Sequence, residues 1–203
     1  MNTKQKILIQ ARAMFMRYGM KSITMDDLSR ELAVSKKTLY EHVESKADLI
    51  NKVIEYDFEM TFKELARILS SSKNAMDEML ELGRFVIKQL RDISPSTWYD
   101  LQKYYREGYV KMMEFHNEHV YVIIKNNLER GINDGLYRND LNIDIVAKLY
   151  TANTLAVVDE NHFPLKKYNR ENLFTEYMHY HLHGIASDEG LKYLETNIKN
   201  FES

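Results

Sequence analysis

The sequence predicts an all-α protein with a small three-helix head at the N-terminus and a larger helical body behind it. Only two of its 203 residues are proline and seven are glycine, and long stretches rich in Glu, Lys, Leu, Met and Ala favour helix. Hydrophobic residues make up 44% and charged residues 29% of the chain, as in globular proteins that bury a core. We expect the head to comprise residues 1–46 and the body residues 47–203.

The first helix is expected over Thr3–Tyr18. Apolar residues recur along it every three or four positions, which gives a helix one buried face; they are Ile7, Leu8, Ala11, Met14, Phe15 and Tyr18. Gly19 follows, and glycine readily ends a helix in the left-handed conformation. Thr24 can cap the second helix, with Asp27 completing a capping box.

The third helix is short and begins after Ser35, a good N-cap residue, with Val34 placed to pack on Leu39. Only residues 33–35 join it to the second helix, so the two must cross steeply. This is the helix-turn-helix arrangement, in which the second helix of the pair enters the DNA major groove.

Seven longer helices should follow, separated by breaks at residues 70–72, 94–96 and 135. The first is capped by Ser45. Their expected ranges are Ser45 to about Leu69, Asn74 or Asp77 to about Asp92, Thr97–Met113, His116–Gly131, Asp144–Val158, residues 168–170 to about His183, and Asp188–Phe201.

The segment 24–46 carries the side chains that DNA recognition requires. Lys in the first turn of a recognition helix can reach guanine, and Thr can contact a base or a thymine methyl group. Tyr and His can donate to phosphates, and a helix start offers free N–H groups to a phosphate. Each such residue alone is usually an ordinary solvated side chain, but together they predict a DNA-binding surface of Thr24, Ser35, Lys36, Lys37, Thr38, Tyr40, His42 and Lys46.

Charge is distributed unevenly between the two parts. Residues 1–50 hold nine Lys/Arg and six Asp/Glu, a balance of +3, whereas the other 153 residues hold 19 and 24, a balance of −5. Such asymmetry is typical of a head that faces a polyanion and a body that does not, although a difference of a few charges is common.

Residues 7–50 resemble the tetracycline-repressor-like (TetR) family of bacterial regulators. The departures are Leu32-Ala33, where the family usually has Ala-Gly, Lys37, where it often has Gly, and Val43, where it usually has Phe. The matching residues are Ile7-Leu8, Ala11, Phe15, Gly19, the Ser22-to-Met25 stretch, Leu28, Val34-Ser35, Thr38-Leu39-Tyr40, His42, Ser45-Lys46 and Leu49.

The resemblance implies a homodimer that binds a palindromic operator in double-stranded DNA, most often as a repressor, with a small-molecule effector held in the body. Effector binding would move the fourth helix and separate the two recognition helices. The helices at about 144–160 and 170–187 would pair with their copies in the partner. A stripe of Leu149, Ala152, Leu155 and Ala156 fits such pairing, and it fits packing within one chain equally well.

Aromatic residues and methionines are concentrated between residues 97 and 121. Such side chains line pockets for apolar effectors, and they also build ordinary helical cores. The candidate effector-pocket residues are Trp98, Tyr105, Tyr109, Met112 and Met113.

Neither an enzyme nor a metal centre is expected. The chain has no cysteine, no phosphate loop and no evident nucleophile. His179 and His183 share a helical face, and His181 lies between them, but a third ligand at matching spacing is missing. We expect no cofactor, no membrane span and a cytoplasmic location. Two alternatives stay open: a metal-using helical enzyme, and a DNA-binding regulator controlled by a protein partner or a metal.

Overall fold

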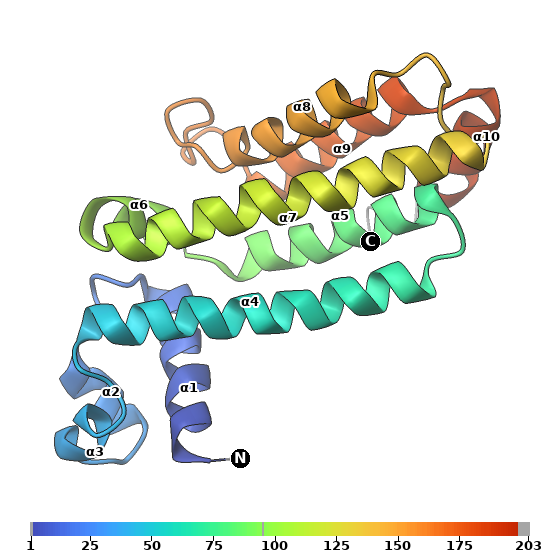
Figure 1. Cartoon of the computed structure of the whole chain (residues 1–203). Helices are drawn as coiled ribbons and strands as arrows, with labels where there is room; N and C mark the ends of the chain where they lie inside the picture. Colours follow the sequence, from blue (N-terminus) through green and yellow to red (C-terminus); the bar gives the residue numbers. More distant parts are fainter. Residues whose placement is uncertain (1, 95, 199–203) are drawn as a thin grey trace. The chain divides into compact units, whose positions relative to one another are not determined.

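The structure is a computed structural model that describes residues 2–94 and 96–198, and within this part the chain is almost wholly helical. The all-α prediction is therefore confirmed (Figure 1). The helices are α1 (Thr3–Tyr18), α2 (Met25–Glu31), α3 (Lys36–Tyr40), α4 (Lys46–Ser71), α5 (Ala75–Asp92), α6 (Ser96–Tyr104), α7 (Arg106–Asn133), α8 (Ile143–Ala156), α9 (Arg170–Ile185) and α10 (Asp188–Asn197).

The chain folds into two compact units. The first unit comprises Met1–Lys63 and Asp92–Met113, and the second comprises Glu64–Arg91 and Glu114–Ser203. Helices α4 and α7 each begin in the first unit and end in the second. The first unit thus contains the expected head of residues 1–46 together with α6 and parts of α4 and α7.

In the first unit, α2 lies beside both α1 and α3 (Figure 1). Helix α1 starts with a capping box between Asn2 and Gln5 and buries the apolar face that its spacing predicts. Leu28 of α2, Leu39 of α3 and Leu49 of α4 are fully buried in the same core. One apolar residue from each short helix thus fixes it on a common platform.

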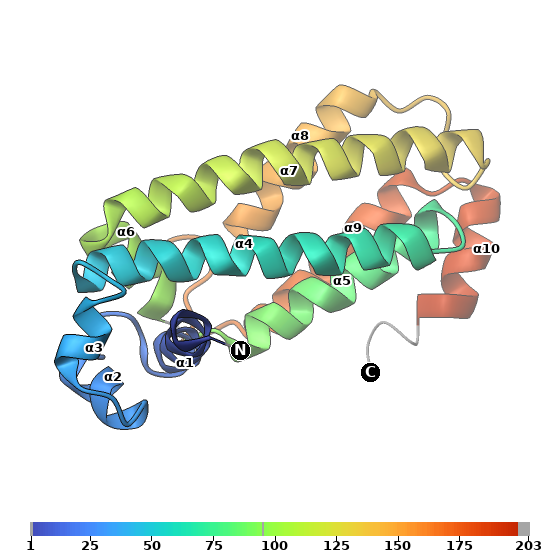
Figure 2. The same ribbon diagram turned by 60° about the horizontal axis from the view of Figure 1, so that its bottom comes forward.

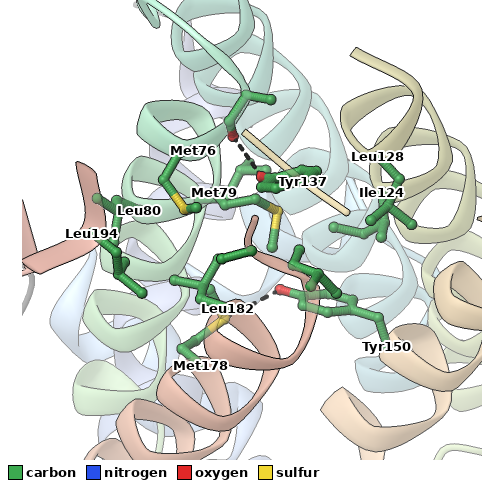
Figure 3. Close-up of a cluster of buried hydrophobic side chains, with 14 of the residues drawn as sticks. Met76, Met79, Leu80, Ile124, Leu128, Tyr137, Tyr150, Met178, Leu182 and Leu194 are labelled. Atoms are coloured by element: carbon green, nitrogen blue, oxygen red, sulfur yellow. Dashed lines mark hydrogen bonds between the residues drawn. The ribbon is translucent and has the colours of Figure 1, made fainter. Parts of the chain in front are cut away.

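In the second unit, α5, α8, α9 and the end of α7 enclose a common core, which α10 closes at one end (Figures 1 and 2). Figure 3 shows methionines, leucines and two tyrosines packed together at its centre. The hydroxyl of Tyr137 donates to the carbonyl of Ala75 (3.0 Å), and that of Tyr150 donates to the sulfur of Met178 (3.6 Å).

A buried polar network joins the start of α5 to α7. Asn127 donates to Glu78 Oε1 and to the carbonyl of Ala75, both at 2.8 Å, and Arg130 pairs with Glu78 Oε2 at 2.6 Å. Tyr137 also donates to Asn127 Oδ1 (2.9 Å). Both carboxylate oxygens of Glu78 and both polar atoms of the Asn127 side chain have partners, although Arg130 Nε has none. These directional bonds fix how α5 and α7 align within an otherwise apolar core.

The predicted helices agree with the structure except around residues 97–131. Two helices meeting near residue 114 were expected, but the chain breaks at Tyr105, and α7 continues through residues 113–116. Residues 113–116 contain no Gly or Pro to stop a helix, so α7 runs through them. Pro95 and the expected end of the last helix near Phe201 lie outside the described residues.

No helix in the described part of the chain is long and apolar enough to cross a membrane.

Candidate nucleic-acid interface

Helix α2 begins at a capping box formed by Thr24 and Asp27. Thr24 Oγ1 accepts from the backbone N–H of Asp27 (3.1 Å), and Asp27 Oδ2 accepts from the backbone N–H (2.9 Å) and hydroxyl (2.6 Å) of Thr24. The bond from the Thr24 hydroxyl is the main reason that the pKa of Asp27 is lowered. Thr24 is exposed, so its position at the open start of α2 is available to a phosphate.

The turn between α2 and α3 depends on a left-handed residue. Ala33 has a φ of +52°, the only described non-glycine residue with a positive φ. Its N–H donates to the carbonyl of Arg30 (3.1 Å), and the N–H of Val34 donates to that of Ser29 (3.0 Å). These bonds close the turn tightly, as the short connection predicted. The TetR pattern has Gly at this position, which the left-handed backbone explains.

Helix α3 is capped as predicted. Ser35 Oγ accepts from the backbone N–H of Thr38 (3.0 Å) and also contacts Thr38 Oγ1 (2.9 Å). Leu39 is fully buried and anchors the helix to the platform. Because this residue faces inward, the opposite face of a five-residue helix must face solvent.

That outer face carries most of the predicted contact residues. Lys36 and Lys37 are exposed, Tyr40 is half exposed, and Thr38 and His42 are half-buried. Lys36 forms an ion pair with Asp26 of α2, in which both side chains remain more than half exposed. An exposed pair of this kind is weak, so a DNA phosphate can compete for the lysine.

Lys46, predicted to contact a phosphate, has other partners in the structure. It is half-buried, its ammonium donates to the carbonyl of Lys21 (3.2 Å), and it lies 5.8 Å from the ring centroid of Tyr105. Burial lowers the pKa of Lys46. One of the three ammonium donors of Lys46 is thus occupied, and its partial burial limits the access of a phosphate.

Sequence reasoning missed a second cationic cluster in the first unit. Lys21 donates to the hydroxyl of Tyr104 (3.0 Å), and the ammonium groups of Lys21 and Lys103 lie 4.5 Å and 5.5 Å from the Tyr104 ring centroid. These contacts join the α1–α2 turn to α6. Helical periodicity could not have revealed them, because they link segments far apart in the sequence.

The five candidate effector-pocket residues all belong to the first unit. Tyr105, Tyr109 and Met112 pack together against its core, while Trp98 and Met113 are half-buried on α6 and α7. Burial raises the pKa of the Tyr105 hydroxyl. A separate open hollow of about 480 Å³ lies in the same unit, and none of the five residues lines it; it is lined by Asn2, Lys4, Gln5, Leu8, Ile9, Lys52, Glu55, Tyr56, Glu59, Met60 and Lys63.

The histidines of α9 differ in their surroundings. His183 Nδ1 contacts the carbonyl of His179 (2.8 Å), whereas His181 is buried beside Tyr150 and Tyr177. Among residues 2–94 and 96–198, no three His, Asp or Glu side chains gather as metal ligands would.

The first segment is similar to a known family of proteins. A model described as bacterial regulatory proteins of the tetR family matches residues 7–53. The chain is 22% identical over 196 residues to the HTH-type transcriptional repressor KstR2 of Mycolicibacterium smegmatis, with 94% of each protein covered.

Solved structures share the fold. A transcriptional regulator from Cytophaga hutchinsonii has a TM-score of 0.73 at 19% identity, covering 90% of this chain and 98% of that one. A gamma-butyrolactone receptor described as ArpA-like has a TM-score of 0.65 at 14% identity, covering 98% and 96%. These likenesses confirm the all-helical fold, and the family model over residues 7–53 confirms the expected resemblance to the TetR family.

Proposed function

We propose that this chain, whose residues 7–53 match the tetR family, is a ligand-responsive transcriptional regulator that binds a palindromic operator as a homodimer. The observation that carries the proposal is the outer face of α3, which presents Lys36, Lys37 and Tyr40 to solvent while Leu39 anchors the helix. A short, cationic, capped helix on a rigid platform suits the DNA major groove.

Each predicted residue has a role in this proposal. Lys36, Lys37 and Thr38 read base edges from the first turn of α3. Tyr40 and His42 contact phosphates, as do Thr24 and Lys46 at the starts of their helices. Ser35 acts indirectly, because its cap sets the direction in which α3 leaves the turn.

A homodimer is supported by α8. Ile145 and Leu149 are 53% and 56% exposed in the single chain, and Ala152 beside them is exposed too. A second copy of α8 and α9 packed on this face would cover an apolar stripe that otherwise faces water.

Repression released by an effector is the simplest mode of action. The proposed effector site contains Trp98, Tyr105, Tyr109, Met112 and Met113, of which three contact the core that also holds α3. A molecule that displaced these side chains would lower the fraction of protein molecules whose N-terminal heads can bind DNA. The name of the butyrolactone receptor with the same fold is in keeping with a small-molecule effector.

The test is to capture the DNA bound by the full chain from fragmented genomic DNA and to sequence it. We expect an inverted repeat whose half-sites lie about one helical turn, ~34–36 Å, or somewhat more apart. A captured set without a shared repeat would refute the proposal. The same experiment with Lys88→Ala, an exposed lysine of α5, serves as a control that should return the same repeat.

An alternative mode of control is a protein partner or a metal in place of an organic ligand. Metal analysis of the purified protein tests for control by a metal. A rise in melting temperature with a small molecule separates control by an organic ligand from control by a protein partner.

A further inference from the structure

We infer that Arg170, the first residue of α9, is the anchor of an oxyanion site in the second unit, which binds a ligand through a carboxylate or phosphate group. This site is separate from the effector site proposed in the first unit, and it does not depend on DNA binding.

Arg170 is buried without adequate partners. The residue is only 8% exposed, and one of its terminal nitrogens is fully covered without a hydrogen bond. Within the described residues its sole ion pair is with Glu160, at 3.6 Å, which is longer than a hydrogen bond, and Glu160 is itself half exposed. A buried guanidinium normally pairs with a carboxylate at close range, because desolvating the charge is otherwise very unfavourable.

The position of Arg170 at the start of a helix makes its poorly paired positive charge still less favourable. Arg170 is the first residue of α9, a helix of 16 residues, where the aligned peptide dipoles place partial positive charge. The Asn169 side chain caps the N–H of Asn172 (3.0 Å). An anion beside Arg170 would be attracted both by the guanidinium and by this helix end.

Nearby carboxylates are already engaged. Glu171, the next residue, pairs with Arg91 at 2.9 Å. Asp159 accepts from the backbone and side chain of Asn161, both at 2.9 Å, and contacts His162 at 3.0 Å. The exposed Lys166 and Lys167 add positive charge to the same loop. The guanidinium of Arg170 is therefore left without a close carboxylate from the described residues, which suits an external anion.

The planar fork of an arginine can hold two oxygens of one carboxylate or phosphate at once. An aromatic pair in the adjoining loop, Phe163 and Tyr168, has rings 5.4 Å apart in edge-to-face geometry. Such a pair could cover the apolar part of a molecule whose anionic end contacts Arg170. The chemistry thus favours an organic acid or a phosphate ester over a cationic or neutral ligand.

The test compares the melting temperature of the full chain in sodium phosphate, sodium hexanoate, sodium chloride and neutral hexanamide, at constant ionic strength for the salts. At a concentration of about ten times its dissociation constant, one of the two oxyanions should raise the melting temperature about 3 °C above the value in chloride. Hexanamide should not raise it. A rise in melting temperature with phosphate alone shows that the site binds a phosphate group, and a rise with hexanoate alone shows that it binds a carboxylate. Because phosphate stabilises folded proteins in general, the decisive quantity is the difference between variants.

Arg170→Met should abolish this response while leaving the melting temperature in chloride unchanged or higher, since it removes a poorly paired buried charge. Arg138→Gln is the matched control; it removes an exposed arginine of the same unit and should keep the full response. If Arg170→Met proves too unstable to measure, Arg170→Lys decides, because it keeps the charge but loses the fork and should weaken the response.

The site is refuted if neither oxyanion stabilises the wild-type protein beyond chloride, or if the Arg170 variant that is measured responds as fully as the wild type. DNA binding is measured in parallel without added oxyanion, and Arg170→Met should retain it. A wild type that binds DNA but does not respond to either oxyanion rejects only this inference, whereas absence of DNA binding in the wild type rejects the proposed function and leaves the oxyanion site standing.

Discussion

Two lysines predicted to contact DNA have very different surroundings. Lys37 is exposed in the first turn of α3, whereas Lys46 is half-buried against Tyr105 and bonded to the carbonyl of Lys21. The sequence revealed the spacing of both residues but not this difference, which arises from segments that are distant in sequence. Lys37 is thus the better placed of the two for a direct contact with DNA.

His181 should make the stability of the protein depend on pH. Burial lowers its pKa from 6.5 to about 4. The unfolded chain therefore binds a proton more readily than the folded one between these values, so stability is complete above pH 6.5 and falls as the pH drops toward 4. The loss should reach roughly 3 kcal/mol of unfolding free energy.

Urea denaturation at pH 7.5, 5.5 and 4.5 checks this, with His181→Phe as the comparison. Phe keeps the aromatic contacts with Tyr150 and Tyr177 but cannot titrate. His116, whose pKa burial also lowers, remains in both proteins and cancels from the difference. Parallel pH profiles for the two proteins would show that His181 is not the source.

The turn between α2 and α3 carries strain that a single substitution can relieve. Ala33 has a left-handed backbone that costs any residue with a Cβ atom about 1–2 kcal/mol. Ala33→Gly removes that cost but adds chain entropy in the unfolded state, so we expect a net gain of about 0.5–1 kcal/mol. Thermal or urea unfolding measures it, and a loss of stability would contradict the assigned turn geometry.

Close packing between α7 and the following turn should make Gly131 intolerant of substitution. A Cβ atom there would fall on the ring of Tyr137, whose hydroxyl bonds to Ala75 and Asn127. Gly131→Ala should therefore destabilise the chain by about 2–3 kcal/mol.

Gly184→Ala is the control, since a Cβ atom there meets no other atom within 4 Å and Ala favours a helix. It should leave the unfolding free energy unchanged or raise it by about 1 kcal/mol. Similar effects from the two substitutions, measured by urea denaturation, would contradict the packing of Tyr137.

Helix boundaries were predictable from sequence wherever a capping residue marks them. Thr24 and Ser35 cap α2 and α3 as expected, and α1 has the predicted bounds. The break at Tyr105 was missed because no Gly, Pro or capping residue marks it in the sequence. Arg170 gave no signal either, because a buried charge cannot be distinguished from a solvated one in the sequence.

At the scale of the whole molecule, the uneven charge has a consequence for DNA binding. The first 50 residues carry a balance of +3 and the rest −5, so only one part of the chain attracts a polyanion. Binding should therefore weaken steeply with salt, because each phosphate that is neutralised releases counterions. For a dimer that makes six or more phosphate contacts, affinity should fall about a thousandfold or more between 50 and 200 mM salt.

Fluorescence anisotropy with a labelled duplex checks this dependence, and Lys46→Ala should reduce the slope of affinity against salt concentration. An affinity that hardly changes with salt would exclude a phosphate-based interface.

The most direct test of the proposed interface is the sequence preference of Lys37→Ala and Thr38→Val. Selection from a pool of random duplexes should yield one inverted repeat for the wild type and for Lys88→Ala, and an altered or relaxed half-site for the two α3 variants. Contacts of this kind are worth about 1–3 kcal/mol per base pair, so the change should be readily visible. If all four proteins selected the same repeat with equal affinity, α3 would not be the element that reads DNA.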